Sequence, residues 1–415
     1  MRLLKLEIKR ILKTRATFVL LSLSLFLSFL LAYLPTTFSG HSYTDEAGNT
    51  VEFKGLAAVR YEKEVQADIA GTVTPEKVRE ALERYQACLT KYGVTETWDL
   101  PEGVYGKELL PYAPLLHGVR EIFADPNTGI APSLMDIDPA KIDDFYSQCE
   151  ERNASLMKQE QRDYPAAQNA AKDMYREVAK PFLFFPGYDR NAMDYQLILA
   201  FLILLFSAVI AAPVFTSDYQ TGADDILRCT KYGKVKFAVT KIASALLICT
   251  VTFSLCSFIY IMVSDSLFGW ESTETSVQML YSIMNLPNMN IRQFQCFFAL
   301  SGLLCLTAAV SFTLFLSSKF KNMVASLSLA LLFSILPLIV YLALPDKIGK
   351  WIYPVIPAGG VGLQTSILYT AIDFEFWNIG NSAVWLPYVM LGAYVIEIPL
   401  FIFLTVYSYT RHNAD

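Results

Sequence analysis

The chain has 415 residues, of which 53% are hydrophobic and only 18% are charged. Its mean hydropathy of +0.35 excludes an ordinary soluble protein of this length and predicts a membrane protein. The apolar residues are unevenly distributed. Hydrophobic runs dominate residues 1–34 and the stretch from residue 195 to the C-terminus, whereas residues 35–194 have the composition of a soluble domain.

The first 16 residues predict a helix that lies in the plane of the membrane. Its apolar and basic residues fall on opposite helical faces, with Leu4, Ile8, Ile11 and Leu12 on one and Arg2, Lys5, Lys9 and Lys13 on the other. Such a helix places its cations among the lipid headgroups. The alternative, a basic orientation signal alone, explains the charges but not their spacing.

Six segments hold the roughly 20 mostly apolar residues that a spanning helix needs. They are residues 17–34, 195–215, 241–263, 294–316, 324–344 and 385–407. The apolar stretch of the first is longer than that of a usual signal peptide, and no clear small-x-small cleavage site follows it. We therefore expect six transmembrane helices, with the first retained.

The distribution of Lys and Arg near the span ends predicts the orientation. With the N-terminus inside, the short outer loops hold only Arg292, Lys347 and Lys350. The cytoplasmic side then holds 14 basic residues, which are Arg2, Lys5, Lys9, Arg10, Lys13, Arg15, Arg228, Lys231, Lys234, Lys236, Lys241, Lys319, Lys321 and Arg411. We expect a multi-pass protein of the cytoplasmic (plasma) membrane, with both termini in the cytoplasm and residues 35–194 extracellular.

The inserted residues 35–194 carry 17 Lys and Arg against 27 Asp and Glu, a net charge of −10. A solvated surface explains this acidity, and attraction of cationic ligands is the alternative. Thr74 precedes a Pro at the first position of a predicted helix that ends at Gly93, and Asp138 opens a second helical run. Alternating apolar and polar stretches are scarce. The sequence thus predicts an all-α integral membrane protein whose mainly helical extracytoplasmic domain is inserted between the first two of six transmembrane helices.

Histidine and cysteine give no sign of a metal site. His41, His117 and His412 are too few and too scattered to form a histidine-built site, and the seven cysteines include no CxxC pair. Cys88 and Cys149 are the two cysteines of the insert. In an oxidising compartment they are a possible disulfide, but the sequence does not give their separation, so paired and free thiols both remain open.

The loop of residues 216–240, predicted to be cytoplasmic, is the most informative stretch. Gly222 and Gly233 bracket a short helical turn that carries Ile226 and Leu227. Apolar side chains on an exposed loop need a cover, and a partner protein would supply it. The alternative is a loop that folds back onto the bilayer.

These features together resemble the ABC-2 type transporter permeases. That family combines an in-plane basic helix and six spans with an acidic residue that precedes a Gly, an Ile/Leu pair and a polar stretch leading into span three. Here Asp218 stands where the family more often has Glu, and Gly222, Leu227, Gly233 and Lys241 match in place. The match covers the membrane portion, and the long first outer loop is found in only some members.

The resemblance implies that residues 218–234 form a coupling helix that docks on a separate nucleotide-binding subunit. The docking residues would be Asp218, Gly222, Ile226, Leu227 and Gly233. Six spans make half a transporter in this family, so a second permease chain is expected, as a homodimer or a heterodimer. Such permeases export drugs, peptides, lipids, polysaccharides or sodium, and the sequence does not select among these substrates.

The outer segment of residues 345–384 is too apolar for a plain solvent loop and too broken by Gly and Pro for a span. Pro354 and Pro357 lie in its apolar part. Irregular backbone at membrane depth is tolerated only where protein or a water-filled cavity covers it. A re-entrant hairpin that caps the pathway fits this, and so does an interfacial loop anchored by Trp351 and Tyr353.

Glu397 lies near the middle of the sixth span and is followed by Pro399. An ionisable side chain there faces the helix bundle or a cavity by default. It is therefore a candidate pathway residue together with Pro354 and Pro357. The alternative is a protonated carboxyl bonded to a neighbouring helix.

The chain lacks several sequence motifs that would mark an enzyme. GxxxxGK[ST], HExxH and GxSxG are all absent from the sequence. We expect no catalytic residues and no cofactor in this chain, with ATP and Mg²⁺ bound by the partner ATPase, and no nucleic-acid partner. The alternative function is a membrane-anchored sensor or adaptor whose helical ectodomain binds a ligand.

Overall fold

The computed structural model describes residues 2–45, 49–125, 128–230 and 233–411, and it is mainly helical. Six helical segments are long and apolar enough to cross a membrane, which is the architecture of a multi-pass membrane protein. They are α2 (Arg15–Tyr33), α8 (Asn191–Ala211) with its continuation α9 (Pro213–Thr221), α11 (Val235–Phe268), α13 (Ile291–Lys319), α14 (Met323–Ala343) and α17 (Leu386–Arg411). Each of the six predicted spans lies on one of these segments.

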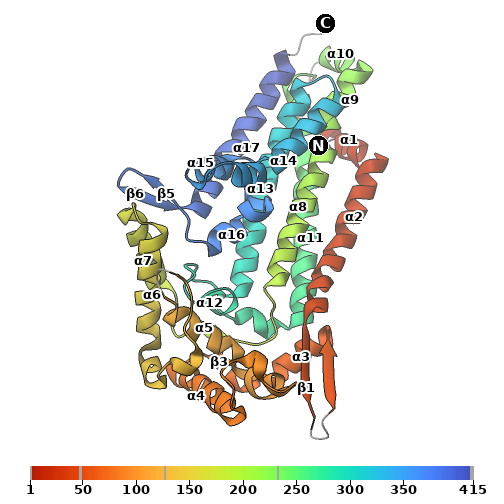
Figure 1. Cartoon of the computed structure of the whole chain (residues 1–415). Coiled ribbons are helices and arrows are strands. Elements are labelled where there is room, and N and C mark those ends of the chain that lie inside the picture. The colour runs from red at the N-terminus through yellow and green to blue at the C-terminus, as the bar shows by residue number, and fades with distance from the viewer. Residues whose placement is uncertain (1, 46–48, 126–127, 231–232, 412–415) are drawn as a thin grey trace.

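Helix α13 is the central element of the bundle and packs against α8, α11, α14 and α17 (Figure 1). Small residues on its surface, among them Ser301, Gly302 and Ala308, are buried. A Cβ atom added at Gly302 would lie 3.0 Å from the ring of Phe253 on α11. Small side chains allow helix backbones to approach closely, which is how helices associate where lipid is the solvent.

The helix α11 is longer than the predicted span of residues 241–263. It begins at Val235 and ends at Phe268, and so includes Lys241 near one end and Asp265 near the other. Both charged side chains are fully buried against polar partners. The predicted span begins at Lys241 and stops before Asp265, because a hydropathy criterion takes no account of polar partners that lie far away in the sequence.

The inserted segment (residues 34–190) lies at the end of the bundle opposite α1 (Arg2–Leu12) and α10 (Ala223–Arg228), as Figure 1 shows. Its helices are α3 (Leu56–Val65), α4 (Pro75–Tyr92), α5 (Ala113–Phe123), α6 (Phe145–Glu160) and α7 (Pro165–Glu177). Helix α4 has the predicted ends. The Thr74 hydroxyl accepts from the amide of Lys77 at 3.4 Å, and Gly93 adopts a left-handed conformation with φ 67°.

Two β-hairpins depart from the all-α prediction. Strands β1 (Gly40–Thr44) and β2 (Thr50–Lys54) pair antiparallel, and so do β5 (Phe376–Ile379) and β6 (Ser382–Trp385). The short strands β3 (Gly71–Thr72) and β4 (Leu183–Phe184) form a third pair. The β5–β6 turn is made by Gly380 and Asn381, and this two-residue turn flanked by apolar residues is the sequence signal that predicts a hairpin.

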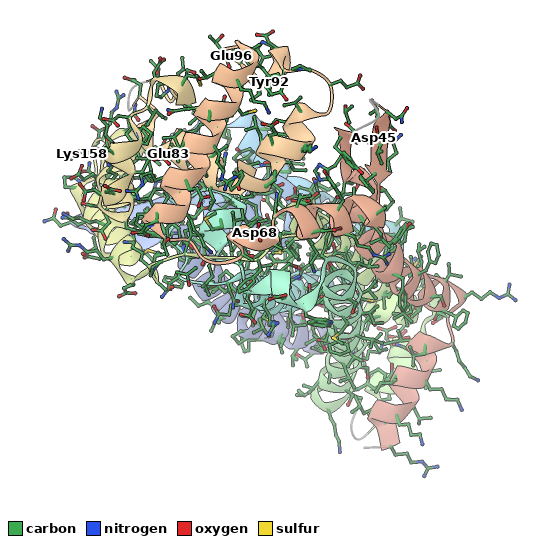
Figure 2. The ribbon with its side chains drawn as sticks, turned by 90° about the horizontal axis from the view of Figure 1, so that it is seen from below. Asp45, Asp68, Glu83, Tyr92, Glu96 and Lys158 are labelled. Atoms are coloured by element: carbon green, nitrogen blue, oxygen red, sulfur yellow. The ribbon has the colours of Figure 1, made fainter. Side chains whose placement is uncertain are left out.

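The face of the inserted segment that points away from the bundle is covered by charged side chains (Figure 2). Asp68 and Glu83 are exposed there, as is Lys158 on α6. The side chains of Arg84 and Lys91 on α4 are paired with Glu80 and Glu108 respectively. The charged side chains named here are thus either exposed to solvent or paired with a residue of opposite charge.

The stretch between α14 and β5 folds back into the bundle. Helices α15 (Asp346–Ile352) and α16 (Ile367–Ile372) flank a run of short 3₁₀ turns that contacts α13, α14 and α17. Tyr353, Pro354 and residues 356–361 are buried. Between α11 and α13 lies one further short helix, α12 (Val277–Leu280), which precedes the loop that leads into α13.

Candidate functional site

A cluster of four charged residues joins α1, α9 and α11 at the end of the bundle where α10 lies (Figure 1). We call Glu7, Arg10, Asp218 and Lys241 the charge cluster. Lys241 is fully enclosed, and Asp218 and Glu7 are 5% and 7% exposed. The cluster is balanced, with two cations and two carboxylates.

Asp218 is the centre of the charge cluster. One of its carboxylate oxygens accepts from the Lys241 ammonium group, and the other accepts from the Arg10 guanidinium at 2.7 Å. Arg10 also pairs with Glu7 at 3.0 Å. The backbone carbonyl of Val214 accepts from Lys241 at 2.6 Å and from Arg10 at 3.3 Å. Charge-assisted bonds of this kind are the stronger class of hydrogen bond.

Backbone groups at the junction of α8 and α9 form hydrogen bonds with Ser317 on the central helix α13. Pro213 has no N–H group and begins α9. Ser317 on α13 donates to the carbonyl of Ala212 at 2.6 Å and accepts from the amide of Phe215 at 3.0 Å. Ser317 thereby bonds the junction of α8 and α9 to the central helix α13.

The short helix α10 presents an apolar side chain to its surroundings. Ile226 is 75% exposed, whereas Leu227 is half-buried and packs on the core. Gly222 ends α9 in a left-handed conformation with φ 67° and turns the chain into α10. The exposed isoleucine is thus carried by a defined helix and not by an irregular loop.

Contacts with the end of α17 hold the region around α10. Arg228 donates to the carbonyl of Thr410 at 3.2 Å, and its guanidinium lies over the ring of Tyr409. The Tyr409 hydroxyl donates to the carbonyl of Gly233 at 3.3 Å. A Cβ atom on Gly233 would lie 1.7 Å from the carbonyl oxygen of Leu227, so this close approach requires glycine.

The predicted docking residues separate into two groups in the structure. Gly222 and Ile226 are exposed, whereas Asp218, Leu227 and Gly233 are turned inward to different degrees. Asp218 in particular is enclosed by Lys241 and Arg10 and has little surface for a partner to contact. Asp218 instead connects α9 to α1 and α11 inside the molecule.

The three predicted pathway residues lie on two elements, Pro354 and Pro357 in the outer segment and Glu397 on α17. Pro354 and Pro357 are buried, and the Pro357 carbonyl accepts from the Cys305 thiol on α13 at 3.3 Å. Glu397 on α17 has one carboxylate oxygen that is buried and has no hydrogen-bond partner among the described residues. The hydroxyl of Tyr394, one turn away on α17, is also buried and has no hydrogen-bond partner among the described residues.

Asp265 is a buried carboxylate that the sequence reading did not single out. It is fully enclosed near the far end of α11, and one of its oxygens accepts from the side-chain amide of Gln295 at 2.8 Å. The same amide contacts the Tyr188 hydroxyl at 2.8 Å. The other oxygen of Asp265 has no partner among the described residues. An acidic residue ending a long apolar run is the signal that indicates it.

Cys88 and Cys149, the possible disulfide, are both free and buried. The Cys88 thiol on α4 faces Glu108, and the Cys149 thiol on α6 faces Tyr175. Burial raises the pKa of Cys88 to about 11 and that of Cys149 to about 12, so both are protonated at neutral pH. The structure therefore places the two thiols in separate surroundings and does not pair them.

Comparison with protein-family models and with curated proteins finds no match to this chain. Among the residues that the structure describes, no group of three or more His, Cys, Asp or Glu is arranged to hold a metal ion.

Proposed function

We propose that this chain is the membrane-spanning subunit of an ABC-2 type exporter, and that α10 docks on a separate ATPase subunit. The observation that supports this most is the exposed Ile226 on a short helix that follows α9 and bonds to α17 through Arg228. An exposed apolar side chain on a rigid support is suited to insertion into a groove of a partner protein.

The charge cluster would transmit movement from α10 to the spans. Helix α10 follows α9, and α9 is tied through Asp218 to Lys241 on α11 and to Arg10 on α1. A displacement of α10 by the partner would then move α1, α9 and α11 together, because separating any of these charges leaves a buried charge without its partner.

The proposed function also implies how the chain is oriented in the membrane and which subunits it assembles with. The basic residues flanking the spans favour a cytoplasmic location for both termini and α10, so that the inserted segment is extracellular. ATP and Mg²⁺ would be bound by the partner ATPase, and a second permease chain would complete the pathway. The chain would reside in the cytoplasmic membrane, and its substrate is left open.

The first test is affinity purification of the tagged protein from its native membrane, followed by mass spectrometry. We expect a soluble ATPase with a phosphate-binding loop to be recovered near stoichiometry. Ile226→Asp should abolish this recovery, because it places a charge in the docking contact. Ile379→Asp is the matched control, since Ile379 is 55% exposed on the β5–β6 hairpin, which packs on α7.

Three outcomes distinguish the proposals. Loss of the ATPase with Ile226→Asp but not with Ile379→Asp supports docking through α10. Recovery of the ATPase by both variants at wild-type yield would exclude this docking site. Recovery of a kinase or another regulator in place of an ATPase would favour the alternative function, a membrane-anchored sensor or adaptor.

A further inference from the structure

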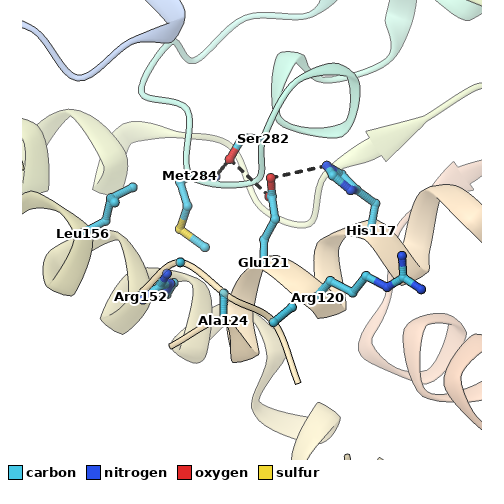
Figure 3. Close-up of a pocket in the computed structure, with 10 residues that line it drawn as sticks. His117, Arg120, Glu121, Ala124, Arg152, Leu156, Ser282 and Met284 are labelled. Carbon is cyan, nitrogen blue, oxygen red and sulfur yellow. Dashed lines mark hydrogen bonds and ion pairs between the residues drawn. The ribbon is translucent and has the colours of Figure 1, made fainter. Parts of the chain in front are cut away.

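The inserted segment contains a cavity of about 310 Å³ between α5, α6 and the loop that leads into α13. Figure 3 shows Leu156, Met284 and Arg152 on one side of it and His117 on the other, with Glu121 between them. The lining also includes Arg120, Ala124, Gly129, Ala131 and Ser282. This cavity is separate from the charge cluster and from α10, and the proposed function does not use it.

The one carboxylate in the lining is already engaged. Glu121 accepts from the amide of Ile283 at 2.8 Å and from the hydroxyl of Ser282 at 3.1 Å. It also pairs with the Nε2 atom of His117 at 3.3 Å. Both of its carboxylate oxygens therefore already have partners in the wall of the cavity.

Arg152 is the unsatisfied group of this cavity. Its Nη1 atom is buried and has no hydrogen-bond partner among the described residues. A buried guanidinium N–H without an acceptor costs free energy, and an anion in the cavity would remove that cost. Arg120 also lines the cavity, but its side chain runs away from Arg152 and its guanidinium interacts with Tyr85. Arg152 therefore supplies the guanidinium group of this site, in a segment whose net charge is otherwise strongly negative.

We infer that this cavity binds a small organic carboxylate. A guanidinium fork matches the two oxygens of a carboxylate, and Leu156, Met284 and Ala124 form an apolar wall for a short hydrocarbon tail. The volume of about 310 Å³ lies at the lower end of the range of small-molecule sites and has room for a ligand of a few carbon atoms. An inorganic anion would use Arg152 but would leave the apolar wall without a contact.

The bound ligand would lie against a segment that leads to the centre of the bundle. Glu121 bonds to Ser282 and Ile283, and this loop continues into α13, which begins at Ile291. In the same loop, the carbonyls of Ile283 and Met284 accept from Tyr175 and Asn153 of the inserted segment. The site therefore joins the inserted segment to the helix that contacts most of the spans.

The test uses the full-length protein in lipid nanodiscs and isothermal titration calorimetry with butyrate. We expect saturable binding of one butyrate per chain, no binding of the neutral analogue butyramide, and at least about tenfold weaker binding of inorganic phosphate. Arg152→Gln should weaken butyrate binding about tenfold or more. Arg176→Gln is the matched control, because Arg176 is an exposed arginine on α7 outside the cavity.

A second variant keeps the test decisive if Arg152→Gln does not fold. Ala124→Leu fills the cavity and leaves Arg152 in place, so it should also abolish butyrate binding. Equal binding of butyrate and butyramide, or unchanged affinity in Arg152→Gln and Ala124→Leu, would overturn the site. Phosphate binding as tight as butyrate binding would overturn the assignment to organic carboxylates.

Discussion

Lys241 is the residue on which the charge cluster depends, because its ammonium group is fully enclosed and contacts both Asp218 and the carbonyl of Val214. Removing one partner of a buried ion pair leaves the other charge without compensation. A variant that removes Lys241 alone should therefore lose more stability than a variant that removes both Lys241 and Asp218.

We predict that Lys241→Met destabilises the protein by about 3–5 kcal/mol, since it leaves Asp218 buried with Arg10 as its remaining cation. The double variant Lys241→Met, Asp218→Asn should recover part of this loss, because it contains no unpaired carboxylate. Thermal unfolding in nanodiscs measures both. A double variant that is as unstable as the sum of its single variants would show that the two residues are not coupled.

His117 makes a pH-dependent contribution to the inserted segment. The hydrogen bond that His117 donates to the Glu121 carboxylate raises the pKa of His117 above its usual value, and burial opposes this shift. A raised pKa means that the protonated histidine stabilises the fold below its unfolded pKa, and that this stabilisation is lost as the pH rises through the folded pKa. The side chain is 61% exposed, so solvent screens the pair and the effect is small.

We accordingly predict that His117→Gln lowers the melting temperature at about pH 5.5 and has little effect at about pH 8.5. The same comparison in a Glu121→Gln background is the control, since the cause of the pKa shift is then absent. A His117→Gln effect that is equal at both pH values would contradict the assigned ion pair.

At the scale of elements, the outer segment is held by glycines that allow it to pack on α17. A Cβ atom on Gly360 would lie 2.7 Å from the hydroxyl oxygen of Tyr394 and 3.2 Å from its ring carbons. The Tyr394 hydroxyl is buried and has no partner among the described residues. The Tyr394 hydroxyl is therefore the atom that a side chain at Gly360 would meet first. This hydroxyl makes no hydrogen bond that would stabilise it there.

We predict that Gly360→Ala destabilises the protein by about 1–3 kcal/mol through overpacking. Tyr394→Phe alone should be nearly neutral or slightly stabilising, because it removes an unsatisfied hydroxyl. Combining the two should recover part of the Gly360→Ala loss, as measured by thermal unfolding. No recovery in the combined variant would mean that backbone contacts, and not the hydroxyl, limit the space.

Elements with local signals could be predicted from the sequence, and those that depend on distant partners could not. The N-cap at Thr74 and the stop at Gly93 are local, and helix α4 has those ends. The link from Arg10 to Asp218 spans 208 positions in the sequence, so neither residue alone indicates it. The turn of the β5–β6 hairpin has a local signal in Gly380 and Asn381, which the prediction of an all-α fold did not take into account.

At the scale of the whole molecule, the proposal places opposite ends of the bundle on opposite sides of the membrane. Cys229, which follows α10, is exposed, and Lys158 is exposed on α6 of the inserted segment. The 14 basic residues that flank the spans favour Cys229 on the cytoplasmic side and Lys158 outside. Native Cys296 is also exposed and must be replaced by Ser to leave a single reactive thiol.

We predict that a membrane-impermeant maleimide labels Lys158→Cys in intact cells when Cys229 and Cys296 are replaced by Ser. With Cys229 retained and Cys296 replaced, labelling should require permeabilised membranes, because the maleimide does not cross the bilayer. The buried cysteines serve as the internal background, since their thiols are enclosed. Labelling of Cys229 in intact cells with protection of Lys158→Cys would reverse the orientation and would place α10 beyond the reach of a cytoplasmic ATPase.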